Sequence, residues 1–545
     1  MLPSSTDSTE FGRLEHETID HLFRLQPTYA VALGLHGYDG RLPDLSRATT
    51  EAWADGADRL LARIAAVGEE SLGPGRSLDR TLLRLLLESP LFDLRDAHEL
   101  ERNPMAYVGA VSLTPYLVRE YAPVPQRVEA IVRTLEAVPA LLETGRRRLA
   151  GPLPQPFIEL ALSIGGGLPA HFAEAEEFAA RASLAPRISA ARAVAEPAVA
   201  RFLEWLRHEE LPRAVPEFAL GPVRYQRLLF VREGLETPFE EIRRAGMEDL
   251  ARNQARLAEI ARAEGRRIEE LFSRINADHP PADGVLDSAR RFVEETKRFV
   301  IEKGLVTVPE PAVCRVEETP VYGRALSTAS MNPPGPFDTT ALEGIYYVTP
   351  VDPKWTPAQQ EEWLRSLNRE MLRNITAHEV YPGHYLQFLH FRAGSRTLAR
   401  QVYLSPSFVE GWAHYAEQLA IEAGLGAGDP GAEVAQLHDA LLRDCRLLAS
   451  VGLHTAGMTI GEATRLFERE AHFEHLPAER EAIRGTFNPE YFCYTLGKLE
   501  ILRARGRTLA SRFHGDLKAF HDTVLGFGSP PIGVLVRLLE AAPAG

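Results

Sequence analysis

Histidine and glutamate residues in the C-terminal third have the types and spacing of a zinc site. The first stretch reads HEVYPGH and covers residues 378–384. A zinc-protease helix usually carries H-E-x-x-H, which places its two histidines one helical turn apart. Here that position holds Pro382, and the second histidine is His384, six residues after His378. On an unbroken helix the two rings would point about 120° apart, too far for one ion.

A proline and a glycine between the histidines could remove this conflict. Pro382 has no N–H, and its ring opposes the carbonyl of His378, so the helix should end or bulge at Tyr381. Gly383 can adopt a positive φ, and the Pro-Gly turn can then bring His384 back toward His378. The alternative is a plain helix stop followed by a surface histidine.

A second stretch, SFVEGWAHYAE (407–417), could supply the third ligand. Glu410, His414 and Glu417 are spaced four and three residues apart and therefore share one face of a helix. A catalytic zinc takes three N or O ligands and leaves a fourth position for water. Two alternatives stay open from these residues: Ser407 and Glu410 also have capping-box spacing, and His414 with Glu417 could be an exposed pair.

A third stretch, NPEYFCYTLGKLEILRARGR, predicts a helix that begins at Asn488 and Pro489. Its Tyr494 could donate a hydrogen bond to a developing oxyanion. Lys498 or Arg503 could bind a substrate carboxylate. The alternative is a core tyrosine accompanied by solvated basic residues.

These residues must be positioned by a mainly helical chain, because a 3.6-residue apolar period runs through most of the sequence. A helix from about 363 to 379 is predicted to end in the H-E pair. Between about 306 and 350, short β-branched and aromatic stretches bounded by proline and glycine predict a small inserted sheet. The proline-rich segment 210–225 is expected to separate an N-terminal helical region (1–220) from a catalytic region (221–545).

Composition restricts the kind of partner. The 545 residues include 61 Lys and Arg against 75 Asp and Glu, a net charge of −14. This acidic balance argues against nucleic-acid and membrane partners, which need a basic face. The three cysteines form no C-x-x-C pair, and neither a signal peptide nor an uninterrupted apolar run long enough for a membrane span is evident. We therefore expect a cytoplasmic protein; its oligomeric state is not indicated.

Taken together, the motifs resemble those of the bacterial proteins of DUF family 885. The shared motifs are H-E-x-x-P-G-H, E-G-W-A-x-Y-x-E, and Y-x-x-G followed by an arginine. LGLHGYDGRLPDLS, GIYYVTP and FHDTVLGFGSPPIGVL also resemble that family, so the resemblance spans nearly the whole chain. It implies a zincin-like metallopeptidase. FVEGWAHYAE is also similar to the second motif of the thimet-oligopeptidase and angiotensin-converting-enzyme group, in which the glutamate binds zinc; this favours Glu410 over Glu417 as the ligand.

The sequence thus predicts a mainly α, gluzincin-like fold, with two helical lobes around a deep cleft and a small sheet beside it. One zinc ion per chain is expected. Glu379 would be the general base toward a zinc-activated water, whose pKa the metal lowers to about 7, and Tyr494 would stabilise the tetrahedral intermediate. The expected metal ligands are His378, His384 and Glu410, and the residues expected to orient a ligand imidazole are Glu417 and His414.

The expected reaction is hydrolysis of short peptides, with a preference for cutting near a free C-terminus. Arg503 is the first choice for the substrate carboxylate, because a guanidinium fork suits it better than the ammonium of Lys498. Tyr346 and Tyr347 lie on a strand along which an extended peptide could pair. Alternatives are a zinc amide hydrolase acting on a small metabolite or biosynthetic intermediate, and a catalytically silent helical binding protein. The intact Glu379 argues against the silent protein.

Overall fold

Helices dominate the fold, as the apolar periodicity predicts. The computed structural model describes residues 2, 9–72, 75–320, 323–324, 327–394 and 397–541. These residues form many helices and one three-stranded sheet, which confirms a mainly α fold with a small sheet. No helix among them is long and apolar enough to cross a membrane.

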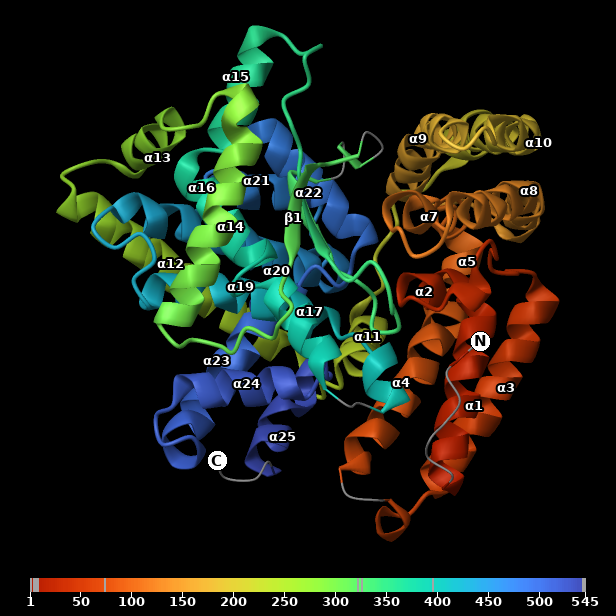
Figure 1. Cartoon of the computed structure of the whole chain (residues 1–545), viewed down its shortest axis with the longest axis horizontal. Coiled ribbons are helices and arrows are strands. Elements are labelled where there is room, and N and C mark those ends of the chain that lie inside the picture. Colours follow the sequence, from red (N-terminus) through yellow and green to blue (C-terminus); the bar gives the residue numbers. More distant parts are fainter. Residues whose placement is uncertain are drawn as a thin grey trace. The chain divides into compact units, whose positions relative to one another are not determined.

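The backbone divides into two compact units, coloured along the chain in Figure 1. The first passes into the second between Leu220 and Gly221, within the proline-rich segment. Two short later segments return to the first unit. The first unit comprises Met1–Leu220, Pro334–Leu342 and Arg396–Tyr403, and the second Gly221–Pro333, Glu343–Ser395 and Leu404–Gly545.

The first unit consists of helices packed mainly against their neighbours in sequence. Helices α8 and α10 lie side by side, as do α9 and α10, and α1 packs on α3 and α4 (Figure 1). Helix α18 also contacts α1. Its elements are α1 (Glu10–Leu25), α2 (Pro27–Ala32), η1 (His36–Tyr38), α3 (Arg47–Ala66), η2 (Glu69–Ser71), α4 (Arg76–Arg95), α5 (Glu99–Arg102), α6 (Met105–Val108), α7 (Thr114–Val118), α8 (Val124–Arg148), α9 (Gln155–Ala180), α10 (Ala185–Trp205), η3 (Leu206–Glu210), η4 (Leu211–Arg213) and α18 (Leu398–Val402).

One of the returning segments is fastened to the first unit by a histidine. His36 Nδ1 lies 3.1 Å from Asp39, and its Nε2 lies 3.3 Å from Asp338 of segment 334–342. The His36 ring stacks on Tyr121, with centroids 3.4 Å apart, and the Tyr121 hydroxyl donates to Asp39. Burial lowers the pKa of His36, but the two carboxylates outweigh it and raise that pKa to about 9. An imidazolium therefore bridges the two parts of the chain.

The second unit is built around the long helix α20, which is buried along most of its length and contacts α12, α16, α21, α22 and α23 (Figure 1). Its helices are α11 (Pro222–Glu233), α12 (Phe239–Ala263), α13 (Ile268–Ala277), η5 (Ala282–Gly284), α14 (Val285–Glu302), α15 (Pro357–Ser366), α16 (Arg369–Glu379), α17 (His384–Ala393), α19 (Pro406–Glu422), α20 (Pro430–Thr455), α21 (Ile460–Glu470), α22 (His475–Phe487), α23 (Cys493–Arg512), α24 (Leu517–Gly526), η7 (Ile532–Val534) and α25 (Leu535–Ala541).

The small sheet contains β1 (Cys314–Glu318), β2 (Ala329–Asn332) and β3 (Gly344–Val348) in the order β1-β3-β2. Strand β3 pairs parallel with β1 and antiparallel with β2. The expectation that a peptide pairs along Tyr346 and Tyr347 is therefore wrong, because β3 is the central strand and both its edges are occupied. The two side chains are also buried, at 0% and 6% exposure. Strand β2, which contacts α16, is the edge strand nearest the H-E pair.

Two predicted helix boundaries are also wrong, and asparagine is the reason in both cases. The helix expected from 363 to 379 is two helices, because the Asn368 side chain caps α16 by accepting the Met371 N–H at 2.9 Å. The third stretch becomes helical at Cys493 rather than at its first residues, because Asn488 ends the preceding helix α22 and forms a turn. Local side-chain hydrogen bonds thus override the apolar period.

Candidate metal centre

The turn between the two histidines forms as the proline predicts, but the glycine acts differently. Helix α16 ends at Glu379 and α17 begins at His384. Gly383 has φ −76°, so the predicted use of positive φ is wrong. A Cβ on Gly383 would instead lie 1.7 Å from the carbonyl oxygen of His378. Glycine is required because the returning chain touches the end of α16, and its N–H donates to the Ala377 carbonyl at 2.9 Å.

The start of α19, which carries Glu410, is held by a buried carboxylate. Ser405 is the N-cap and accepts the Phe408 N–H at 3.0 Å. Glu233 accepts hydrogen bonds from the Ser405 hydroxyl and, at 2.8 Å, from the Ser407 N–H. Burial raises the pKa of Glu233 to about 7, although both serines oppose the shift. Because the cap is Ser405, the capping-box alternative for Ser407 and Glu410 does not form, which leaves the Glu410 carboxylate free for another role.

Close backbone contacts fix α19 against the turn and against α23. The Trp412 indole N–H donates to the Pro382 carbonyl at 2.9 Å. A Cβ on Gly497 would lie 1.8 Å from the Ser407 carbonyl oxygen, and one on Gly411 would lie 2.4 Å from the Cα of Gly497. The two helices therefore cross in backbone contact, which only glycine at both positions permits.

The turn and the crossing bring three potential ligands together. Glu410 Oε2 lies 3.4 Å from His384 Nε2 and 3.6 Å from His378 Nε2. The two imidazole rings are nearly perpendicular, in a T-shaped arrangement, with centroids 4.7 Å apart. All three ligand atoms lie within 4.8 Å of one another, and no other group of three such side chains occurs in the described part of the chain. Ligands about 2.1 Å from a tetrahedral zinc stand about 3.4 Å apart, so the two carboxylate–imidazole distances fit this geometry.

The charges of the cluster favour a cation. Burial raises the pKa of Glu410, but hydrogen bonds from His378 and His384 outweigh it and hold that pKa well below its usual value. Burial lowers the pKa of His378, but Glu410 and Glu417 outweigh it and raise that pKa to about 9. The carboxylates of Glu410 and Glu417 thus stabilise positive charge at the cluster.

A buried network orients the first imidazole. His378 Nδ1 lies 2.6 Å from Glu417 and donates to it, so Nε2 is the ring nitrogen that faces the cluster. Glu417 is fully buried and also accepts from Arg443 at 3.2 Å and from Asn374 at 3.3 Å. His414 was expected to help, but its Nδ1 is 3.6 Å from Glu417, and neither ring nitrogen has a hydrogen-bond partner among the described residues. Of the two residues predicted to orient the imidazole, Glu417 is therefore the one whose hydrogen bond fixes His378.

Sequence reasoning did not find Asn374 or Arg443. Asn374 precedes His378 by four residues and shares its helical face, so the spacing alone could have suggested it. Arg443 lies on α20, 65 residues after His378, and no local pattern connects the two.

Glu379 lies between the histidines and the edge strand. Burial raises its pKa, although the histidines and a backbone hydrogen bond from Met331 oppose the shift. In an antiparallel pair of strands, hydrogen-bonded and non-hydrogen-bonded residue pairs alternate. The Thr349 N–H donates to the Thr328 carbonyl at 2.9 Å, so these two residues form a hydrogen-bonded pair. Met331 lies three positions further along β2, opposite Tyr346, and therefore belongs to a non-hydrogen-bonded pair. Its N–H and C=O point away from β3. The outer edge of β2 therefore faces Glu379.

Tyr494 lies near the cluster, between two arginines. The Cζ atoms of Arg446 and Arg443 lie 5.1 and 5.7 Å from the Tyr494 ring centroid. Burial is the main cause that raises the pKa of the Tyr494 hydroxyl, and the Glu410 carboxylate adds to it. The hydroxyl is therefore protonated at neutral pH and can act as a donor.

Lys498 and Arg503, the two basic residues predicted to bind a substrate carboxylate, both pair with acidic side chains of the protein. Lys498 is 1% exposed, and its Nζ lies 2.6 Å from Asp249, so the substrate role assigned to it is wrong. Arg503 has a side chain that is 54% exposed and pairs with Glu500 at 3.0 Å. It follows Tyr494 by nine residues, about 13 Å along the helix.

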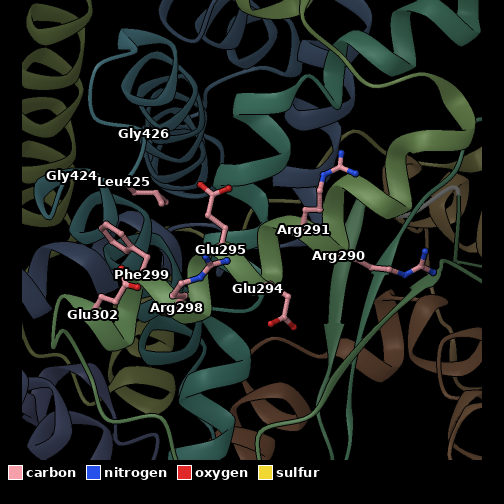
Figure 2. Close-up of a pocket in the computed structure, with 10 residues that line it drawn as sticks. All are labelled: Arg290, Arg291, Glu294, Glu295, Arg298, Phe299, Glu302, Gly424, Leu425 and Gly426. Carbon is pink, nitrogen blue, oxygen red and sulfur yellow. The ribbon is translucent and has the colours of Figure 1, made fainter.

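A separate pocket of about 730 Å³ lies along α14 (Figure 2). Basic and acidic side chains alternate along it, and residues 424–426 close one end. None of the three clustered ligands lines this pocket. It is therefore distinct from the candidate metal centre.

Comparison with known proteins agrees with the motifs. The family described as "Bacterial protein of unknown function (DUF885)" matches residues 27–539. The chain belongs to this family. No curated protein matches it. The DUF885 chain shares its fold with a structure described as a candidate lipoprotein of unknown function from Shewanella oneidensis, with TM-score 0.82 and 24% identity over 98% of this chain and 100% of that one. A candidate lipoprotein from Colwellia psychrerythraea matches with TM-score 0.79 and 18% identity over 97% of each chain.

Proposed function

We propose that this DUF885 chain is a zinc-dependent hydrolase of the gluzincin type that cleaves short peptides. One observation carries the proposal. Two imidazole nitrogens, of His378 and His384, converge on one carboxylate oxygen of Glu410 at the edge lengths of a tetrahedral zinc site. Glu417 orients the first imidazole, as carboxylates commonly do for zinc-binding histidines.

The chain supplies the remaining catalytic groups. A zinc ion bound there would polarise the scissile carbonyl and lower the pKa of a water molecule. Glu379, with its raised pKa, would accept the proton of the attacking water and pass it to the leaving nitrogen. Tyr494, whose hydroxyl stays protonated, would donate to the oxygen that becomes negative during attack.

The substrate would bind in extended form along β2. The outward peptide groups of Met331 face the side of Glu379, and β2 lies at an edge of the sheet. An extended peptide can add to such an edge through main-chain hydrogen bonds, which accept many side chains. This assignment replaces β3 as the pairing strand.

The test combines metal content with a panel of short peptides and N-acyl amino acids. His384→Ala should lose the zinc, whereas His390→Ala, on the same helix and bonded to the Thr307 carbonyl, should keep it. Glu379→Gln should keep the zinc and lose about 10²- to 10⁴-fold in hydrolysis. Glu410→Gln should weaken zinc binding strongly.

Each failure would have its own meaning. Stoichiometric zinc in His384→Ala would remove the metal site from this turn. Equal zinc loss in Glu379→Gln would make that residue a ligand instead of a base. Hydrolysis of N-acyl amino acids without hydrolysis of peptides would replace the peptidase with an amide hydrolase of small molecules, and zinc without any hydrolysis would favour a silent binding protein.

A further inference from the structure

Arg484, near the end of α22, forms no direct ion pair in the described part of the chain; its charge acts on the Glu481 carboxylate only at longer range, and that carboxylate pairs with Arg446. The residue is half-buried, and its guanidinium forms no ion pair or side-chain hydrogen bond there. It is held instead over the ring of Tyr491, with Cζ 5.2 Å from the centroid. Removing a cation from water without a partner is costly, so a half-buried unpaired guanidinium indicates that a ligand supplies the anion.

Neighbouring arginines do not share this property. Arg443 lies 3.0 Å from Glu417. Arg446 binds both oxygens of Glu481 at 2.8 Å. The charges of these two arginines are therefore neutralised by carboxylates of the protein. Of these three described arginines, Arg484 is the one without a carboxylate in direct contact, so its charge remains for a ligand.

Arg484 is connected through ring contacts to Tyr494, the proposed oxyanion donor. Arg446 lies 4.9 Å from the Tyr491 ring centroid and 5.1 Å from that of Tyr494, so it connects the two tyrosines. The charge of Arg484 acts to lower the pKa of the Tyr494 hydroxyl, and the charge of Glu410 acts to raise it. One hydroxyl thus lies within electrostatic range of both the metal cluster and the unpaired arginine.

We infer that Arg484 binds a carboxylate of the substrate beside the bond that is cut. A guanidinium can donate two parallel hydrogen bonds to one carboxylate. The contact with the Tyr491 ring restricts the position of the Arg484 guanidinium before a ligand binds. The carboxylate would come from the free C-terminus of a short peptide or from an acidic side chain near the cut. The inference rests on the proposed function and gives Arg484 the role first expected of Lys498 or Arg503.

The test is equilibrium binding to the full-length Glu379→Gln protein, measured by calorimetry. The probes are tetra-alanine, its C-terminal amide, and an amidated Ala-Ala-Asp-Ala. Tetra-alanine should bind about 10- to 100-fold more tightly than its amide, which is the usual effect of hydrogen bonds to a charged group. Adding Arg484→Ala should reduce that preference to less than about 2-fold while the amide binds as before, and Arg484→Lys should restore part of it.

Arg480→Ala is the matched control, because Arg480 is an exposed residue one turn earlier on the same helix, and it should keep the full preference. Tight binding of the amidated aspartate peptide would identify an acidic side chain as the source. Equal binding of all three probes, no binding of any of them, or an equal loss on all three in Arg484→Ala would overturn the inference. A preference that survives Arg484→Ala and disappears in Arg503→Ala would give the role to Arg503.

Binding to a variant that does not hydrolyse separates this inference from the proposed function. A preference that depends on Arg484 upholds the inference even when the peptide panel shows no cleavage. Zinc-dependent cleavage with equal binding of all three probes upholds the proposed function alone.

Discussion

Replacing Glu417 by glutamine should weaken zinc binding without touching a metal ligand. Glu417 accepts the His378 Nδ1–H at 2.6 Å and is fully buried beside Arg443. Glutamine removes the charge and presents an amide N–H to groups that are themselves donors. Losing such a partner of a zinc-bound histidine typically costs 10- to 100-fold in metal affinity, roughly 1.4–2.7 kcal/mol. Arg443 also loses a partner, which would destabilise the metal-free protein by up to about 3–5 kcal/mol.

The assay must separate these two losses. The free energy of unfolding is measured for each variant with excess zinc and with a chelator, and the difference is the stabilisation by zinc. In Glu417→Gln that difference should shrink by about 1.4–2.7 kcal/mol, whatever the metal-free protein has lost. Glu422→Gln is the control, because Glu422 is on the same helix but pairs with Arg505 at 2.7 Å on the surface. If zinc stabilises Glu417→Gln as much as it stabilises the wild type, the orienting role of Glu417 is refuted.

Three further changes test the parts that position the site. Gly497→Ala should destabilise the protein by about 1–3 kcal/mol in chemical denaturation, whereas Gly506→Ala, on the same helix with open space around it, should be neutral or stabilising; equal effects would contradict the backbone crossing. Gly383→Ala should lose zinc, because a Cβ would strike the His378 carbonyl, and retained stoichiometric zinc would show that the turn tolerates it. Burial raises the pKa of Glu233 from 4.5 to about 7, so its contribution to stability is present below pH 4.5 and is lost as pH rises through 7. Denaturation across this range should show up to about 3 kcal/mol of loss that Glu233→Gln removes, and an unchanged pH profile would contradict it.

Local residue chemistry was enough to predict the helical class, the small sheet and the break between the two histidines. Apolar period, β-branched clusters and a proline each act over a few residues, so the sequence displays them directly. Predictions failed where a side chain competes with the backbone, as Asn368 does by dividing one expected helix into two. The order of the strands was also not readable, because pairing depends on contacts between segments far apart in the chain.

The sequence by itself determined which residue types are available for a metal: two histidines flanking a Pro-Gly turn, and a glutamate on a later helix. Only the tertiary structure decided that Glu410 reaches both imidazoles, because that requires α19 and α23 to cross at two glycines 86 residues apart. It also decided which charges are free. Lys498 pairs with a buried aspartate, whereas Arg484 has no ion-pair partner among the described residues. Burial and pairing are properties of the packed interior and leave no trace in local spacing.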